Sequence, residues 1–409
     1  MDHALRHYLV VTGAYWAFTL TDGALRMLVV LYFHDLGYSP LEVASLFLFY
    51  EFFGIVTNLV GGWLGARFGL ARTLHLGMAL QVVALAALTV PSVWLTVPWV
   101  MTAQALSGIA KDLNKMSAKA SVKTLTATIG DTRLFHWVAV LTGSKNALKG
   151  VGFFLGAALL AGLGFRGAMV AMAGALGAVL LATALALPRD LGRLRVTPKF
   201  GEVFSRVPAI NQLAAARFAL FGARDAWFVV GLPVFLATEL GWPVLAVGGF
   251  LAAWVIAYGV VQAATPRLLA RTGHRHPGGG TARRAVAALV AVPVLMALAL
   301  RAGFAPGLVV VIGLGVFGLV FALNSAVHSY LVLAYAHGDR VALDVGFYYM
   351  ANAAGRLAGT AVSGYAYGTH GLAGCLWWSA GLLLVALACS LWLPPVESTG
   401  PATAARDAA

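Results

Sequence analysis

Charged side chains are scarce in this sequence. Only 11% of its 409 residues are Asp, Glu, Lys or Arg, against roughly 25% in a soluble globular chain. Hydrophobic residues make up 60% of the chain, and a soluble fold has too little interior to bury that much apolar surface. The composition therefore excludes a soluble enzyme or binding module and indicates a membrane protein.

Cysteine is also rare. The two cysteines, Cys375 and Cys389, fall in one predicted helix, where a separation of 389 − 375 = 14 residues corresponds to about 21 Å. Thiols so far apart neither form a disulfide nor hold one metal ion together. The sequence also lacks a phosphate-binding P-loop and the His and Cys spacing of a metal site. We therefore predict that the protein is not an enzyme, with no catalytic residues, no metal and no cofactor.

Apolar runs of about twenty residues, long enough to cross a ~30 Å hydrocarbon core as a helix, recur along the chain. Backbone groups in lipid must satisfy their own hydrogen bonds, so each run is predicted to be helical. The first run contains Asp22 and Arg26 and no small-residue cleavage site, so we expect it to be retained and not to be a signal peptide. The predicted fold class is an all-α membrane protein with twelve transmembrane helices, at 8–33, 41–64, 73–94, 97–117, 136–160, 165–187, 210–236, 245–268, 285–300, 307–336, 343–367 and 372–393.

The helices are predicted to form two pseudo-symmetric halves. An internal repeat supports this division, because Gly37 aligns with Gly241 at an offset of 241 − 37 = 204 residues. Three further pairs keep the same register: Tyr50 with Trp254, Asn58 with Gln262, and Arg67 with Arg271. Parallel halves of this kind rock about a central site in transporters. The predicted domains are an N-terminal six-helix bundle at 1–187, a cytoplasmic linker at 188–209, a C-terminal six-helix bundle at 210–393 and a disordered cytoplasmic tail at 394–409.

Basic residues are distributed unevenly between the predicted loops. With the N-terminus in the cytoplasm, eighteen of the 28 Lys and Arg residues fall on the cytoplasmic side, and only Arg166 and Arg301 fall on the other. The positive-inside rule then predicts a multi-pass protein of the cytoplasmic (inner) membrane with both termini cytoplasmic. This asymmetry explains most of the net charge of +13. The expected partners are the lipid bilayer and a small anionic substrate, without nucleic acid, and a monomer is expected.

The segment GWLGARFGLAR at 62–72 resembles the signature loop of the major facilitator superfamily, G-x-L-x-D-R-x-G-R-[KR]. Ala66 replaces the aspartate of that pattern, which removes the carboxylate on which a charge lock at the helix end would depend. The resemblance implies a twelve-helix transporter fold and a gating role for Arg67. Four positions match: Gly62, Leu64, Arg67 and Gly69.

Four further segments are similar to the ArsJ family of organoarsenical effluxers from arsenic operons. The resemblance implies secondary active efflux of 1-arseno-3-phosphoglycerate, conferring arsenate resistance, and a functional link to glyceraldehyde-3-phosphate dehydrogenase, which forms this ester when it accepts arsenate in place of phosphate. Two alternatives remain: transport or exchange of an organic phosphate or another organic anion, and a transport-inactive membrane sensor. The segments are LTDGALRML at 20–28, SGIAKDLNKMSAK at 107–119, TGSKNALKG at 142–150 and FGARDAWF at 221–228.

Positive charges exceed negative charges inside the predicted helices. Each costs about 2.5 to 3.5 kcal/mol at the centre of a membrane helix, so we expect them to converge on one wet chamber that holds an anion. The interpretation fails if every cation has a carboxylate of its own. The predicted intramembrane cations are Arg26, Lys111, Lys115, Lys145, Lys149, Arg217, Arg224 and Arg356, and the acids are Asp22, Glu51, Asp112 and Asp225.

The strongest anion-site candidates are Lys145 and Lys149, which lie four residues apart on one face of the fifth predicted helix. Arg356 in the eleventh helix is the matching wall of the other half. A guanidinium grips a phosphate or arsenate with two parallel hydrogen bonds, whereas an ammonium acts as a point charge. The predicted substrate-binding residues are Lys149, Arg356, Lys111, Lys145, Arg224, Arg26, Asn146, Asn352, Asn58 and Tyr349.

Carboxylates and a histidine are candidates for coupling or gating. Asp22 and Arg26 share a helical face and are predicted to form an intrahelical ion pair. Asp225 is predicted to turn away from its neighbour Arg224, to pair with a cation of the first half and to act as a proton-linked switch. The predicted coupling or gating residues are Asp22, Asp225, Glu51, His328 and Arg67.

The fourth predicted helix carries two lysines and an aspartate: Lys111, Lys115 and Asp112. Lys111 and Lys115 align on one face, and Asp112 is predicted to turn away from them. Lys111 is the deeper residue and the predicted cavity contact. Lys115 and Lys119 are predicted to be interfacial anchors near the cytoplasmic surface.

Overall fold

The computed structural model describes residues 3–37, 46–126, 131–188, 191, 204–229, 231–271, 277–336 and 340–396. All regular structure in these residues is helical, so the all-α prediction is confirmed. Most of the predicted linker at 188–209 and of the tail at 394–409 lies outside the described residues. The helices are α1 (His3–Asp35), α3 (Leu48–Phe68), α4 (Leu70–Ala87), η1 (Ser92–Trp94), α5 (Val97–Thr126), α6 (Asp131–Ala186), α7 (Pro208–Phe228), α8 (Gly231–Thr238), α9 (Val244–Arg271), α10 (Gly279–Arg301), α11 (Pro306–Tyr335) and α12 (Val341–Ser390).

Two of these helices contain a sharp turn at a glycine. Gly164 in α6 has φ +66° and Gly371 in α12 has φ +61°, a backbone region that glycine enters without the steric cost that a Cβ atom imposes. Each of the two therefore comprises two predicted spans. With α7 and α8 on either side of residue 230 taken as one span, the described helices overlap all twelve predictions.

The internal repeat is visible in the backbone. Gly37 and Gly241, which define the sequence offset, both have positive φ angles, +88° and +65°. Small residues also pack equivalently in the two halves. A methyl group on Gly23 of α1 would lie 2.7 Å from the carbonyl of Lys149 in α6, and one on Gly359 of α12 would collide with the backbone of Gly222 in α7. The first helix of each half therefore contacts its fifth span through glycine.

The largest boundary difference concerns α5. The prediction ends this helix at residue 117, whereas the helix continues to Thr126. Hydropathy locates the apolar part of a helix, but backbone hydrogen bonding and packing against neighbouring helices extend the helix beyond that part. Lys119, predicted to be an interfacial anchor, therefore lies within the helix and is only 3% exposed. That prediction is wrong.

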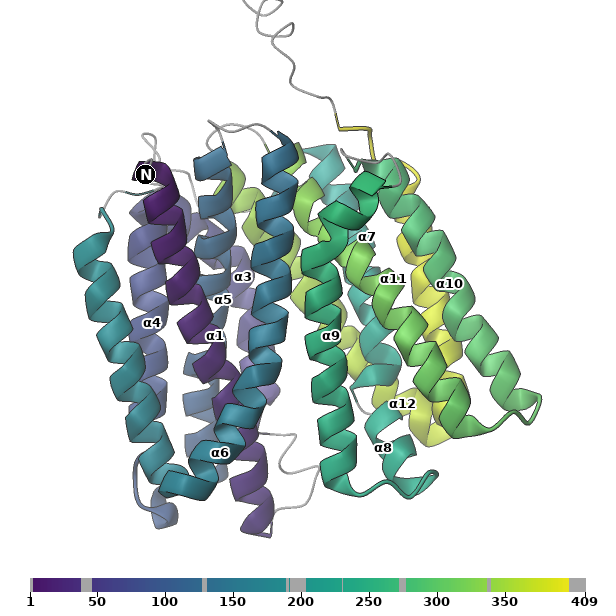
Figure 1. Cartoon of the computed structure of the whole chain (residues 1–409), viewed down its shortest axis with the longest axis horizontal. Helices are drawn as coiled ribbons and strands as arrows, with labels where there is room; N and C mark the ends of the chain where they lie inside the picture. Colours follow the sequence, from purple (N-terminus) through teal and green to yellow (C-terminus); the bar gives the residue numbers. More distant parts are fainter. Residues whose placement is uncertain are drawn as a thin grey trace, which may run out of the picture.

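The helices form two groups side by side, α1 to α6 and α7 to α12 (Figure 1). At one end a single hydrophobic cluster joins both groups, with Tyr8 and Phe135 from the first and Tyr330 and Tyr348 from the second. The ring centroids of Phe135 and Tyr330 are 5.1 Å apart. Two further clusters lie each within one group. Among the described residues, the two halves therefore share a hydrophobic core at the end with the joint cluster and at no other place.

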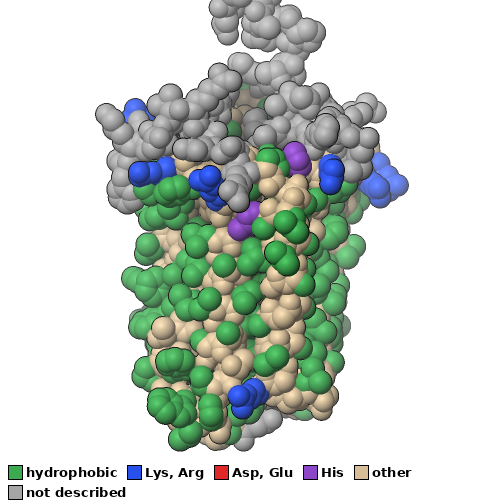
Figure 2. Space-filling model, turned by 90° about the vertical axis from the view of Figure 1, so that its left-hand side faces the viewer, with side chains coloured by type: hydrophobic (Ala, Val, Ile, Leu, Met, Phe, Trp, Pro, Cys, Tyr) green, Lys and Arg blue, Asp and Glu red, His purple; other side chains and the backbone are tan. Residues whose placement is uncertain are grey.

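We name this end, at which α1, α6 and α7 begin, the basic end. On the face shown in Figure 2, Lys and Arg side chains gather mostly at this end, above a largely hydrophobic wall. Seven stretches of the described residues are long and apolar enough to cross a membrane. The stretches outside this set, α1, α3, α5 and the first part of α6, carry internal charges, including Asp22, Glu51, Lys111 and Lys149.

Candidate functional site

Ion pairs link α1, α3, α6, α7 and α12 in the middle of the bundle, and two more lie within α5. Within the described residues, six cations share four carboxylates through seven contacts of 4.0 Å or less. Among these contacts, Glu51, Asp112 and Asp225 are each shared by two cations, and only Asp22 has a single cation, Lys149. We name this group the ion-pair belt; it consists of Asp22, Glu51, Asp112, Asp225, Arg26, Lys111, Lys115, Lys149, Arg224 and Arg356.

Arg356 is the belt residue that connects the two halves. Its Nη2 atom lies 3.2 Å from Oε1 of Glu51 on α3, and its Nε atom lies 3.2 Å from Oδ2 of Asp225 on α7. The predicted pairing of Asp225 with a first-half cation is wrong, because its two partners, Arg356 and Arg224, both belong to the second half. The guanidinium of Arg224 bends back to the neighbouring Asp225 at 2.6 Å.

Asp22 and Arg26 do not form the predicted intrahelical pair. The hydroxyl of Tyr50 donates to Asp22 at 2.6 Å, and the ammonium of Lys149 lies 4.0 Å from the same carboxylate. Arg26 instead binds Glu51 at 2.9 Å and lies over the Tyr50 ring at 4.2 Å. The cause is α3, which presents Tyr50 and Glu51 together to α1, so both α1 side chains find their partners on other helices.

Asp112 is not turned away from the lysines of α5, which corrects another prediction. Its Oδ1 atom lies 2.5 Å from the ammonium of Lys115, and its Oδ2 atom lies 3.6 Å from that of Lys111. Long lysine side chains bend back across a helical turn, so Cβ direction alone did not predict this arrangement. Lys111 also lies over the Tyr50 ring, with its ammonium 3.9 Å from the ring centroid.

Three other cations, the buried Lys119 and Arg217 and the half-buried Lys145, have no carboxylate within ion-pair distance among the described residues. We name them the cation cluster. Lys119 and Arg217 are each 3% exposed, and the Nζ atom of Lys119 has no hydrogen-bond partner. Both Lys145 and Arg217 are close enough to act on Lys119 electrostatically. Arg217 donates to the Asn352 side-chain oxygen at 2.8 Å and to the Ser325 hydroxyl at 3.1 Å.

The cluster lies on the same helices as the belt, displaced towards the basic end. Lys119 follows Lys115 by one turn on α5, and Lys145 precedes Lys149 by one turn on α6, about 6 Å in each case. Arg217 precedes Arg224 by two turns on α7. The cluster therefore stands between the belt and the hydrophobic contacts that close the basic end. Its members come from both halves, so an anion bound there would contact both.

Buried charges without partners are costly, because each loses its hydration and receives no counter-charge. The cluster offers two ammonium groups and one guanidinium, which are the donors that an anion accepts from. Of its members, only Lys145 belongs to the predicted substrate-binding set. The four-residue spacing of Lys111, Lys115 and Lys119 was a signal that could have placed Lys119 on the same inward face.

A polar chain connects the two halves beside the cluster. Asn146 on α6 donates to Gln262 on α9 at 2.6 Å, and Gln262 donates to Ser325 on α11 at 3.0 Å. Ser325 in turn accepts from Arg217. The predicted site residues Asn146 and Asn352 therefore reach the cluster by hydrogen bonds.

The remaining predicted site residues differ in whether they lie beside the belt and the cluster. Tyr349 is buried, with the Lys115 ammonium 4.5 Å from its ring centroid. His328 is fully buried near Arg217, and neither ring nitrogen has a hydrogen-bond partner. Asn58 donates to the Gly54 carbonyl of its own helix. Arg67 is exposed at the end of α3, where its guanidinium lies over Trp63, so the structure does not bring it to the belt.

Comparison with known proteins matches this chain to a family. A model of the Major Facilitator Superfamily matches residues 11–332. No curated protein matches the chain in sequence.

Several solved structures share the fold. A bacterial homologue of the iron transporter ferroportin in its outward-facing state has 14% identity and a TM-score of 0.73, over 96% of this chain and 99% of that one. The human organic anion transporter MFSD10 (TETRAN) has 16% identity and a TM-score of 0.74, over 95% and 100%. The E. coli fucose:proton symporter FucP has 12% identity and a TM-score of 0.72, over 94% and 98%. At these identities the likeness shows the fold alone.

Proposed function

The chain belongs to the Major Facilitator Superfamily, whose members perform secondary transport, and from this premise we propose that its cargo is a small organic anion bound at the cation cluster. The observation that carries the proposal is the absence of any carboxylate partner for Lys119, Lys145 and Arg217 within the described residues. An anion is the partner that their charge favours.

The charge balance supports a multiply charged cargo. The belt and the cluster together contain 6 + 3 = 9 cations and four carboxylates, a surplus of 9 − 4 = 5. A cargo with two or more negative charges reduces this surplus, whereas a cationic drug would be repelled by it. The guanidinium of Arg217 suits a tetrahedral oxyanion, and the two ammonium groups tolerate some movement of the cargo.

Within this class we propose export of 1-arseno-3-phosphoglycerate, with arsenate resistance as its outcome. The four segments that are similar to the ArsJ family contain most of the belt and two of the three cluster residues, Lys119 and Lys145. The ester has a phosphate at one end and an arsenate at the other, so it is a polyanion of the kind that this charge balance favours. Glyceraldehyde-3-phosphate dehydrogenase would supply it from arsenate on the cytoplasmic side.

The proposed transport cycle follows from the position of the cluster. In the inner membrane, with the basic end and both termini in the cytoplasm, separation of the halves at that end admits the anion to Lys119, Lys145 and Arg217. Bound charge offsets the repulsion among these cations, which favours closure of the two halves around the cargo. Opening of the opposite end then releases the anion outside. This is alternating access about a central site.

Everted membrane vesicles test the proposal directly. Glyceraldehyde-3-phosphate dehydrogenase, glyceraldehyde 3-phosphate, its nicotinamide cofactor and labelled arsenate are added outside, so that the ester forms in place. We expect labelled arsenic to accumulate in vesicles that contain the protein and not in vesicles without it. Arsenate without the dehydrogenase should not accumulate, and an excess of a multiply charged organic anion should slow uptake.

The alternatives give different results in the same vesicles. If labelled 3-phosphoglycerate accumulates and the ester does not, the cargo is an organic phosphate and not the arsenical ester. The proposal of an anion site would then still hold. Accumulation of neither, by folded protein at normal abundance, would favour a transport-inactive sensor and overturn the proposal.

A further inference from the structure

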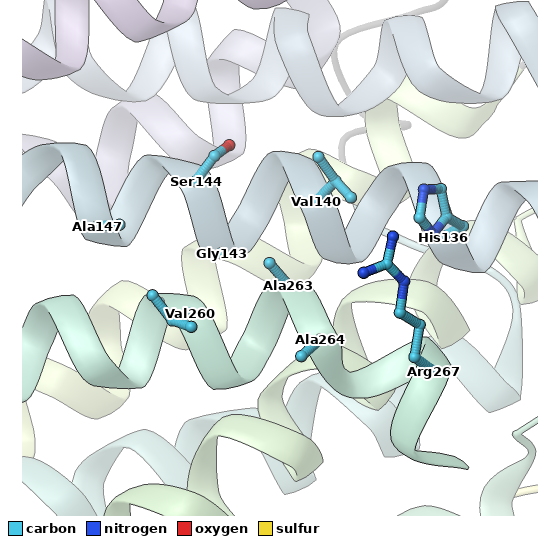
Figure 3. Close-up of a pocket in the computed structure, with 10 residues that line it drawn as sticks. His136, Val140, Gly143, Ser144, Ala147, Val260, Ala263, Ala264 and Arg267 are labelled. Carbon is cyan, nitrogen blue, oxygen red and sulfur yellow. The ribbon is translucent and has the colours of Figure 1, made fainter. Parts of the chain in front are cut away.

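A groove of about 350 Å³ lies between α6 and α9, on the seam between the two halves (Figure 3). His136, Val140 and Ser144 line it from α6, and Val260, Ala263 and Arg267 line it from α9. Val260 is 58% exposed, so the groove opens to the outside of the bundle. The ion-pair belt and the cation cluster contribute no residue to it. In the membrane, this opening faces lipid.

Close approach of the two helices forms the floor of the groove. A methyl group on Gly259 would lie 2.5 Å from the backbone nitrogen of Ala147 and 2.6 Å from the carbonyl oxygen of Gly143. The Ser144 hydroxyl accepts a hydrogen bond from the indole of Trp16 at 2.9 Å, so this polar group of the wall is already satisfied. The body of the groove is therefore apolar, and its charge is confined to the end with Arg267.

The dimensions suit one lipid leaflet. From His136 to Ala147 the groove follows α6 for 147 − 136 = 11 residues, about 16 Å of helix. This length is about half of the ~30 Å hydrocarbon core. Arg267 lies at the end of the groove nearest the basic end, with its guanidinium directed towards His136 (Figure 3). Arg267 is exposed and has no carboxylate partner among the described residues.

We propose that this groove binds an anionic phospholipid, with its headgroup phosphate at Arg267 and His136 and an acyl chain along the seam of α6 and α9. Arginine holds a phosphate through parallel N–H donors, and a histidine ring adds a further N–H. Basic residues at the membrane surface attract anionic headgroups. A free phosphate would leave the apolar body of the groove empty, whereas a phospholipid fills both the apolar body and the charged end at Arg267.

The position on the seam gives the lipid a conformational role. The groove exists in this form while the halves are packed together at the basic end. A lipid seated on both α6 and α9 therefore stabilises this arrangement against separation of the halves, by the difference in its affinity for the two states. This inference does not depend on the identity of the transported anion.

Native mass spectrometry of the purified full-length protein tests the site, with phosphatidylglycerol and phosphatidylcholine of identical acyl chains as probes. We expect preferential retention of phosphatidylglycerol. Arg267→Ala should weaken this retention about fivefold, the contribution of one basic residue near an anionic surface. Val260→Trp, which fills the groove without changing charge, should also reduce it.

Arg271→Ala is the matched control. Arg271 is exposed on the same helix, one turn beyond Arg267, and does not line the groove. Its loss removes the same charge and should leave the retained lipid unchanged. Equal losses from both arginine variants, equal retention of the two lipids, or displacement by glycerol 3-phosphate as effective as by phosphatidylglycerol would each overturn the proposal.

Discussion

The ion-pair belt and the cation cluster are two groups of buried charges on the same helices, and they are held in opposite ways. In the belt, each carboxylate contacts one or two cations, and Arg356 joins the halves through Glu51 and Asp225. In the cluster, Lys119 has no hydrogen-bond partner and Arg217 binds only neutral groups. Burial alone therefore does not assign a role to a charge.

Under the proposed function, this difference assigns the belt to stability and the cluster to cargo binding. Removing one partner of a buried ion pair leaves an uncompensated charge, which is destabilising. Removing an unpaired buried charge relieves a cost that the folded protein already bears. Substitutions in the belt should therefore damage the fold first, and substitutions in the cluster should damage transport first. The following predictions test this contrast, from the largest expected effect to the smallest.

Asp225→Ala should produce the largest loss of stability. Asp225 is fully buried and holds the guanidinium groups of Arg224 and Arg356. Truncation of one partner of a buried pair costs about 3 to 5 kcal/mol, so the midpoint of thermal unfolding in detergent should fall by several degrees. Asp225→Asn, which keeps a hydrogen-bond acceptor of the same size, is the control and should lose less. An unchanged midpoint for the alanine variant would show that the belt does not stabilise the fold.

Lys119→Met should show the opposite pattern. The variant replaces a buried, unpartnered ammonium by an apolar side chain of similar length, so the unfolding midpoint should stay the same or rise. Transport should fall about ten- to hundredfold, because a charged hydrogen bond to the anion contributes roughly 1.5 to 3 kcal/mol. Initial rates in vesicles, normalised to folded protein, measure this loss.

Lys119→Arg is the matched control for that variant. It retains the positive charge and should recover part of the transport lost in Lys119→Met. Full transport by Lys119→Met, or a fall in its stability equal to that of Asp225→Ala, would remove the distinction between cluster and belt.

Glu51→Gln should change the balance of conformations by a smaller amount. Glu51 is the first-half partner of Arg356, and both side chains are about a quarter exposed, so solvent screens their attraction. We expect the arrangement that is closed at the basic end to lose about 1 kcal/mol of stabilisation. The population that is open at this end should then rise roughly fivefold. Distances between spin labels on exposed residues of the two halves at that end measure this population. An unchanged distance distribution would show that the bridge between halves does not hold them together.

The helical architecture was predictable from the sequence, whereas the pairing of charges was not. Hydropathy and backbone hydrogen bonding act along the chain, so the twelve spans, and the repeat whose offset Gly37 and Gly241 define, could be predicted from the sequence. Partner choice depends on neighbouring helices. Arg26 binds Glu51 and not Asp22 because α3 presents Glu51 within reach of α1, and Lys119 is buried because α5 extends beyond its apolar segment.

Arg67 shows that a sequence motif likewise does not predict the partners of a charged side chain. Its place in the signature loop implies a gating role, yet the side chain is exposed and contacts Trp63 and Phe68 through their ring faces. Ala66 stands where the pattern has a carboxylate. The motif therefore identifies the fold, whereas its charge lock requires a residue that this chain does not have.

Arg67→Ala should accordingly have the smallest effect of the series. An exposed cation–π contact contributes about 0.5 to 1 kcal/mol, so transport in vesicles should change by less than fivefold and the unfolding midpoint only slightly. Its repeat counterpart provides the control, since Arg271→Ala should give an effect of similar size. A loss as large as that of Lys119→Met would mean that a solvent-exposed guanidinium gates transport without a carboxylate partner. In that case the contrast between belt and cluster would no longer account for where this transporter places its functional charge.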